Sequence, residues 1–213
     1  RFLLSKGHAC PVLYALLAMK GYVPLEVLGT LRQLGGILQG HPDMNKTPGV
    51  DYTTGSLGHG LSLGVGMALA GKLDALDYRT YVMLGCGEMQ EGLVWEALMA
   101  GAKYGLDNVC AIVDYNGLQL DGTNDEVMPL GQLTAKLVAF DWHVIECDGH
   151  DLEGIRAALA GARATSDRPS VIVAHTVKGK GVSFMEDRVE WHGRVPTQEQ
   201  FEQAMAELRA TPA

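Results

Sequence analysis

Short apolar runs alternate along the chain with longer segments whose apolar residues recur at helical spacing. Four runs rich in β-branched residues predict buried parallel strands over residues 81–84, 109–113, 144–145 and 171–174. Helical spacing predicts helices over residues 9–20, 56–74, 91–105, 130–140 and 151–164, and a polar terminal helix over 196–210. Because strands and helices alternate, we expect an α/β domain whose mostly parallel central sheet carries helices on both faces.

Composition adds limits to this picture without changing it. No low-complexity linker or repeat is evident, so one domain is expected over residues 1–213. With 47% hydrophobic and 20% charged residues, the chain is typical of a folded globular protein. The formal net charge of −8 argues against nucleic acid or an anionic membrane as the main partner, because both require a basic surface. The apolar runs are too short and too often interrupted to span a bilayer.

The four cysteines, Cys10, Cys86, Cys110 and Cys147, do not have the spacing of a zinc finger. Cys110 and Cys147 lie in or at the end of predicted strands, so both are expected to be buried thiols. Scattered thiols without a disulfide pattern are typical of a reducing compartment, and we expect the cytoplasm.

Two loops that follow neighbouring predicted strands carry residues suited to binding a ligand. Gly85-Cys86-Gly87 leads from a strand into a helix, where glycines permit close approach and free N–H groups suit a phosphate. Asn116-Gly117 follows the next strand. Since ligands bind beyond the carboxyl ends of strands in open sheets, these loops are expected to lie side by side. A nicotinamide-binding loop fits less well, because its third glycine is displaced to Gly92.

These loops resemble the motif of thiamine-diphosphate enzymes, in which Gly-Asp-Gly and a later Asn hold a divalent cation on the cofactor's phosphates. Segments along most of the chain also resemble transketolase N-terminal subunits, in the same order; they are residues 2–8, 40–42, 54–60, 88–97, 114–122, 178–181 and 191–193. The resemblance implies the thiamine-diphosphate-binding fold. The chain would be its diphosphate-binding domain, without the helices that precede this domain in the family.

The resemblance also implies roles for individual residues. The catalytic histidines would be His8, His41 and His192; the cofactor would contact Gly55, Leu57, Gly85, Gly87, Glu88 and Asn116; the metal ligands would be Cys86, the Asn116 side chain and the Leu118 carbonyl; and Glu91 and Glu96 would lie at a subunit interface. Imidazoles suit proton movement because their pKa lies near neutral pH. His143, His150 and His175 are expected to have no catalytic role.

One residue departs from the family pattern. Cys86 stands where the family has the metal-binding Asp, and a thiolate is a soft ligand whereas Mg²⁺ prefers hard oxygen donors. Three outcomes are open: weakened cofactor binding, replacement of the usual metal by a softer one, or loss of the cofactor. Because the rest of the motif is intact, we expect weakened binding.

The function implied by the resemblance is transfer of a two-carbon ketol unit from a ketose to an aldose, both as sugar phosphates, with thiamine diphosphate and Mg²⁺, Ca²⁺ or Mn²⁺. The expected partner is a C-terminal transketolase subunit with the pyrimidine-binding domain, in a heterotetramer that also involves self-association. Two alternatives stay open. One is another thiamine-diphosphate enzyme, such as deoxyxylulose-phosphate synthase, and the other is a non-catalytic homologue with impaired cofactor binding.

Overall fold

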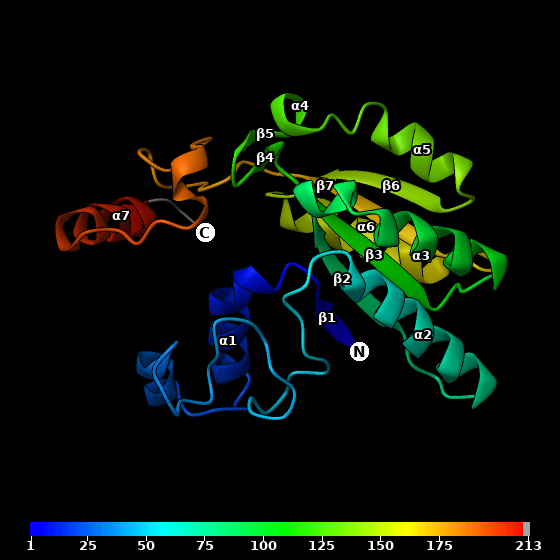
Figure 1. The fold of residues 1–213 in the computed structure, drawn as a ribbon, viewed down its shortest axis with the longest axis horizontal. Helices are drawn as coiled ribbons and strands as arrows, with labels where there is room; N and C mark the ends of the chain where they lie inside the picture. The colour runs from blue at the N-terminus through cyan, green and yellow to red at the C-terminus, as the bar shows by residue number, and fades with distance from the viewer. Residues whose placement is uncertain (211–213) are drawn as a thin grey trace.

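A single parallel sheet positions the functional loops. The computed structural model describes residues 1–210 and contains a five-stranded sheet of order β1-β2-β3-β7-β6, in which all neighbouring strands are parallel (Figure 1). The strands are β1 (Phe2–Leu4), β2 (Thr80–Gly85), β3 (Val109–Tyr115), β6 (His143–Asp148) and β7 (Ser170–His175). The expected parallel α/β architecture is thereby confirmed, and β2, β3, β6 and β7 contain the four apolar runs.

Helices occupy the segments that have helical spacing, with ends that differ by a few residues from the expected ones. They are α1 (Cys10–Met19), α2 (His59–Leu73), α3 (Gly92–Lys103), α5 (Leu133–Ala139), α6 (Leu152–Ala164) and α7 (Gln198–Ala210). A small hairpin of β4 (Leu118–Gln119) and β5 (Gly122–Thr123) and the one-turn α4 (Asn124–Val127) follow β3. Short 3-10 turns cover Gly7–Ala9, Leu25–Thr30, Gly87–Gln90 and Val189–His192.

The two faces of the sheet are covered unequally. One face of the sheet, which includes Val82 and Val113, packs against α2, α3 and α5 and forms the main core. Leu98 of α3 is one of the buried side chains in this core. On the other face, Cys110 and Ile172 pack against α6. An apolar cavity of about 670 Å³ remains on this second face, with α1 and α6 contributing to its walls.

The edge strand β1 was not expected from the sequence. Only three residues pair with β2, in the register Phe2↔Tyr81 to Leu4↔Met83, so the run is too short to show a periodic pattern. This pairing carries the chain directly into residues 5–9 at the carboxyl edge of the sheet. The cysteine expectation was half correct, since Cys110 is buried but Cys147 is only partly buried.

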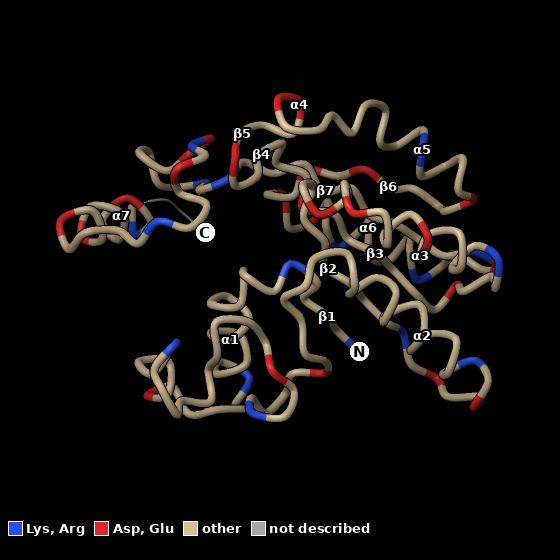
Figure 2. Tube along the Cα trace, in the orientation of Figure 1, with Lys and Arg blue, Asp and Glu red and all other residues tan. Residues whose placement is uncertain are grey.

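The helix α7 lies apart from the sheet in Figure 1. Ser183 links the segment before α7 to this helix, since its N–H and hydroxyl donate to the Glu207 carboxylate at 2.6 and 2.8 Å. Figure 2 shows acidic and basic residues interspersed over the chain, with acidic residues on α4 and α7. Within residues 1–210, no helix is long and apolar enough to cross a membrane.

Candidate functional site

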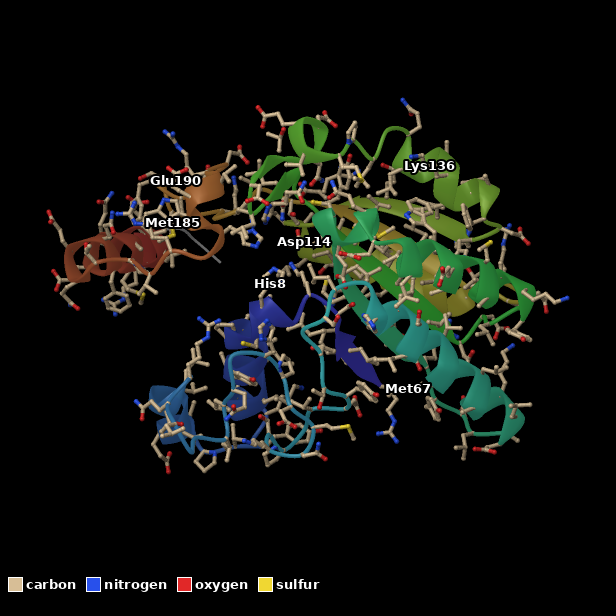
Figure 3. All side chains as sticks on the ribbon, viewed as in Figure 1. His8, Met67, Asp114, Lys136, Met185 and Glu190 are labelled. Atoms are coloured by element: carbon tan, nitrogen blue, oxygen red, sulfur yellow. The ribbon has the colours of Figure 1, made fainter. Side chains whose placement is uncertain are left out.

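A crevice of about 500 Å³ opens at the carboxyl edge of the sheet. The loops after β1, β2, β3 and β7 meet there because these four strands are consecutive and parallel, so that Gly85 of β2 lies opposite Asp114 of β3. Figure 3 labels His8 and Asp114 at this edge. The position agrees with the rule that open α/β sheets bind ligands beyond the carboxyl ends of their strands.

The turns at residues 85–87 and 116–118 face each other across the floor of the crevice. The Cys86 N–H donates to the Asp114 carbonyl oxygen at 3.2 Å, which fixes the first turn against β3. In the second turn, the Leu118 N–H donates to Asn116 Oδ1 at 3.0 Å. The buried Cys86 Sγ lies 3.6 Å from Asn116 Oδ1 and 3.9 Å from the Leu118 carbonyl oxygen. The sulfur of Cys86 therefore lies within 4 Å of both oxygens that the sequence suggested as metal ligands.

The chemistry of these donors fits one class of cation better than another. The Asn116 and Leu118 oxygens are donors of the kind that suit Mg²⁺, Ca²⁺ and Mn²⁺. The sulfur of Cys86 does not fit Mg²⁺, which takes hard oxygen ligands in octahedral geometry.

Positive charge gathers in the crevice although the chain is acidic. Lys6 forms an ion pair with Asp114, which also accepts a hydrogen bond from the Thr176 hydroxyl. Burial disfavours the ionised form of Asp114, but Lys6, Thr176 and Lys178 outweigh it and hold the pKa of this carboxyl below its usual value. Burial and the neighbouring Lys6 lower the pKa of Lys178. Asp114 pairs with Lys6 and leaves Lys178 without an ion pair of its own among the salt bridges of the described residues, so the part of the crevice around the two lysines is suited to an anion.

The sequence placed Lys6 and Lys178 inside family-like segments but assigned neither a role. Their spacing along the chain gives no sign that they meet. Only the parallel pairing of β1, β2, β3 and β7 brings the loops after β1 and β7 together. The available signal was that each lysine lies in a family-like segment, residues 2–8 and residues 178–181.

Histidines form one wall of the crevice. The rings of His8 and His192 have centroids 5.1 Å apart, and Lys178 Nζ lies 3.4 Å from His192 Nδ1. His41 lines the same crevice and its ring packs against the backbone of Gly55, where an added Cβ would meet it at 3.1 Å. The three histidines expected to act together are therefore brought together.

Burial and the charges around these rings lower their proton affinity. Desolvation by the crevice walls, followed by the charges of His192 and Lys6, lowers the pKa of His8 to about 4, even though the ring is open to the crevice. Desolvation, Lys178 and Lys6 likewise lower the pKa of His192. Both imidazoles are consequently neutral near neutral pH, when each can donate from one nitrogen and accept at the other.

Two features of the lining leave room and unused bonding capacity for a ligand. Gly87 lies so close to Gln119 that a Cβ would approach the Gln119 Cβ at 3.0 Å, and Gly55 has a φ of 144°, which favours glycine. Among the described residues, the buried Gln119 Nε2 has no hydrogen-bond partner. Leu57 supplies an apolar part of the lining. The cavity fits a ligand that has both an anionic and an apolar part.

Glu88, which was expected to contact the cofactor, lies in the lining of the crevice. Its buried carboxylate accepts hydrogen bonds from the Ser5 hydroxyl, from the Gly58 N–H at 2.9 Å and from the Gly85 N–H at 3.1 Å. Burial raises the pKa of Glu88, and these donors work against that rise. The carboxylate thereby links the end of β1, the start of α2 and the end of β2, and it holds this wall of the crevice in place.

The two carboxylates expected at an interface are exposed. Glu91 borders the crevice just before α3, and Glu96 lies on the surface of α3. His150, expected to have no catalytic role, accepts a hydrogen bond from the Val177 N–H at 2.8 Å. His175 lies outside the crevice lining and pairs with Glu146 at 2.8 Å.

Comparison with known proteins gives consistent matches. The family described as "Transketolase, thiamine diphosphate binding domain" matches residues 1–213. One of the subunits of an apulose-4-phosphate transketolase from Phocaeicola vulgatus is 48% identical over 208 residues, which are 98% of this chain and 74% of that relative. One of the subunits of a 6-deoxy-6-sulfo-D-fructose transketolase from Clostridium sp. is 47% identical over 98% of this chain and 76% of its own length.

Solved structures agree with these relatives. The transketolase from Leishmania mexicana has a TM-score of 0.92 and 36% identity, over 98% of this chain and 33% of that one. The transketolase from Pichia stipitis, solved in complex with a sedoheptulose 7-phosphate, has a TM-score of 0.94 and 32% identity, over 98% of this chain and 32% of that one. The chain thus spans about a third of each of these transketolase chains.

Proposed function

Because this chain belongs to the transketolase family through its thiamine diphosphate binding domain, we propose that its crevice binds thiamine diphosphate and that, with a second chain, it transfers a two-carbon ketol unit from a ketose to an aldehyde. The observation that carries the proposal is the convergence of two glycine turns, two lysines and three histidines at one edge of the sheet. When bound, thiamine diphosphate supplies the nucleophilic carbon and the electron sink for the transfer.

The anionic end of the cofactor is held by the lysines and the turns. Lys6 and Lys178 bind the phosphates, and the partial burial of both strengthens each charge-assisted hydrogen bond. Gly85 and Gly87 let the backbone approach the same group. Asn116 and the Leu118 carbonyl hold a divalent cation beside it.

The opposite wall binds the apolar part of the cofactor and the substrate. Leu57 packs against the cofactor's rings, and Gly55 makes space by carrying no side chain beside His41. Neutral His8 and His192 bind the hydroxyl and carbonyl oxygens of the sugar and move protons between them. Closure of this wall by a partner chain would exclude water from the reacting carbon.

We propose that a second chain carries the pyrimidine-binding domain and the glutamate that activates the cofactor's aminopyrimidine. The relatives named as transketolase subunits support a two-chain enzyme. Glu91 at the rim of the crevice and Glu96 on α3 are exposed and lie in this interface. Two copies of each chain form the assembly.

The substrates are sugars that carry a terminal anion. The two bacterial relatives described above act, by their names, on a sugar phosphate and on a sulfonated sugar. Arg32 is exposed at the crevice and adds a positive charge where such a group would enter. We place the enzyme in the cytoplasm, since its four cysteines are free and suit a reducing compartment.

The test combines the purified chain with its candidate partner. We expect no ketol transfer by this chain alone and transfer by the pair, measured as the appearance of the ketose product from a ketose phosphate donor and an aldose phosphate acceptor. Turnover by the isolated chain would remove the need for a partner. Failure of the pair to turn over, together with failure to bind thiamine diphosphate, would favour a non-catalytic homologue instead, an alternative motivated by Cys86.

A further inference from the structure

The groups on the floor of the crevice are hydrogen-bonded to one another. The buried Cys86 Sγ donates to Asn116 Oδ1 at 3.6 Å and lies 3.9 Å from the Leu118 carbonyl oxygen. The Leu118 N–H donates to the same Asn116 oxygen at 3.0 Å. Because an amide oxygen has two lone pairs, both are engaged here. A cation at this place would have to displace the thiol from the oxygens that it contacts.

The carboxylates inside the crevice are engaged elsewhere. Mg²⁺ in proteins is usually held by one or two carboxylates together with phosphate oxygens. Asp114 pairs with Lys6 and accepts a hydrogen bond from the Thr176 hydroxyl, and Glu88 accepts three hydrogen bonds. Within residues 1–210, no group of three His, Cys, Asp or Glu side chains could hold a metal ion. The floor therefore offers a dication only neutral donors.

Two lysines bring positive charge to the same crevice. Lys6 and Lys178 line it together with Cys86 and Asn116. Lys178 takes part in none of the salt bridges of residues 1–210, and its Nζ lies 3.4 Å from His192 Nδ1. A lysine ammonium binds phosphate as a point charge. The chain itself can therefore balance the charge of an anion in this crevice.

A thiol at position 86 changes what a cation has to do. A carboxylate at this place would repel the phosphate oxygens, and a dication between the two would turn that repulsion into attraction. The thiol adds no negative charge that needs such a bridge. The lysines can then act on the anion directly.

We propose that this chain holds the diphosphate of its cofactor by direct contact with Lys6 and Lys178 and does not require a divalent cation to do so. A cation beside Asn116 and Leu118 is an accessory to this binding and not a condition of it. Only the identity of the ligand, thiamine diphosphate, rests on the proposed function. The metal independence rests on the thiol, the engaged oxygens and the lysines.

Inorganic pyrophosphate is the probe, because it carries the anionic part of the cofactor alone. The full chain is titrated with it by calorimetry, first in a metal chelator and then with excess Mg²⁺. We expect binding in the chelator, and Mg²⁺ should strengthen it by less than about 10-fold, which is about 1.4 kcal/mol. Binding that requires Mg²⁺, or that Mg²⁺ strengthens by more than this, contradicts the proposal.

Two variants at position 86 isolate the effect of charge. Cys86→Asp introduces a carboxylate and should weaken pyrophosphate binding in the chelator by at least about 10-fold, and Mg²⁺ should recover the loss. Cys86→Ser is the matched control, because its hydroxyl is a neutral donor of similar size, and it should bind as the native chain does. Circular dichroism checks that both variants are folded. A Cys86→Asp variant that binds as independently of Mg²⁺ as the native chain would count against the proposal.

A third variant distinguishes the lysines from a cation. Lys178→Met should weaken pyrophosphate binding to the same extent in the chelator and in Mg²⁺, because the lysine and not a cation holds the anion. If Mg²⁺ restores the affinity of this variant to the native value, a cation can hold the anion in place of the lysine, and the proposal is wrong.

Failure of this proposal is distinguishable from failure of the proposed function. If pyrophosphate binds in the chelator but thiamine diphosphate does not bind in either condition, the proposed cofactor is wrong and the metal-independent anion site stands. If thiamine diphosphate and pyrophosphate bind only with Mg²⁺, the cofactor stands and metal independence is wrong. If neither ligand binds in either condition, both proposals are wrong.

Discussion

His8 and His192 lie at opposite ends of the chain, yet their imidazole rings pack with centroids 5.1 Å apart and planes inclined by 30°. The contact joins the turn after β1 to the turn that precedes α7. Burial of both rings, together with the charges of Lys6 and Lys178, lowers the pKa of each imidazole, and His192 adds to the shift of His8.

The first prediction concerns the proton affinity of His8. Its imidazole should stay neutral down to a pH of about 4, and His192→Asn should raise the pKa of His8 because it removes the second-largest cause of the shift. Inorganic pyrophosphate should also raise it by offsetting the lysine charges. Ring nitrogen shifts measured by NMR against pH provide the check, and a His8 that titrates near the ordinary value of about 6.5 contradicts it.

The same shift has a defined effect on stability. Because the unfolded chain takes up a proton at the ordinary histidine pKa of 6.5 and folded His8 does so only near about 4, the unfolded state binds more protons between these values. The free energy of unfolding should therefore decrease as the pH falls from 6.5 toward 4. His8→Asn should make this part of the profile shallower in urea unfolding measured at several pH values.

The second prediction tests the anion site through Lys178. Lys178→Met should weaken the binding of inorganic pyrophosphate about 10- to 100-fold, the range expected for losing a hydrogen bond to a charged group. Lys180→Met is the matched control, since Lys180 is exposed and pairs with Glu186 at 3.8 Å. Calorimetric titration measures both. Equal losses in the two variants would point to a general charge effect and not to a site.

The third prediction concerns the hydrogen bonds that the Glu88 carboxylate accepts in the wall of the crevice. At about pH 8, Glu88→Gln should lower the free energy of unfolding by about 1–3 kcal/mol, because the amide NH2 replaces one carboxylate oxygen and then faces the N–H of either Gly58 or Gly85. Urea unfolding measures the loss. The exposed neighbour Glu91 serves as the control, and Glu91→Gln should stay within about 0.5 kcal/mol of the native chain. A Glu88→Gln variant as stable as that control would show that the three bonds contribute little.

The fourth prediction concerns the close packing of α2 on the sheet. A Cβ at Gly64 would collide with the Val82 side chain, so Gly64→Ala should destabilise the fold by about 1–3 kcal/mol. Gly66 lies two residues further along the same helix, with nothing near its Cβ position. There, alanine should stabilise the helix by about 0.5–1 kcal/mol. Thermal and urea unfolding of the pair measure the difference, and effects of the same sign and size would argue against the packing.

The sequence determined much of the fold because the relevant signals are local. Strands buried on both faces are continuous apolar runs, and the helices between them keep a helical period, so the parallel sheet and its main helices follow from pattern alone. The edge strand β1 and the β4–β5 hairpin were not predicted, because two or three residues are too few to show a period. Family-like motifs added the identity of the turns at Cys86 and Asn116 and of the three histidines.

Tertiary structure decided what the site is made of. Lys6, Asp114 and Lys178 become one charge cluster only because β1, β3 and β7 end at the same edge of one parallel sheet, and the order of these strands is not encoded in any short segment. Glu88 accepts hydrogen bonds from Ser5, Gly58 and Gly85, three residues that only the fold brings to one carboxylate. The contacts from Cys86 to the Asn116 and Leu118 oxygens exist only once two turns are fixed side by side. Sequence patterns report which groups are present, whereas the free energy of a charge or a metal ligand depends on separations that folding alone sets.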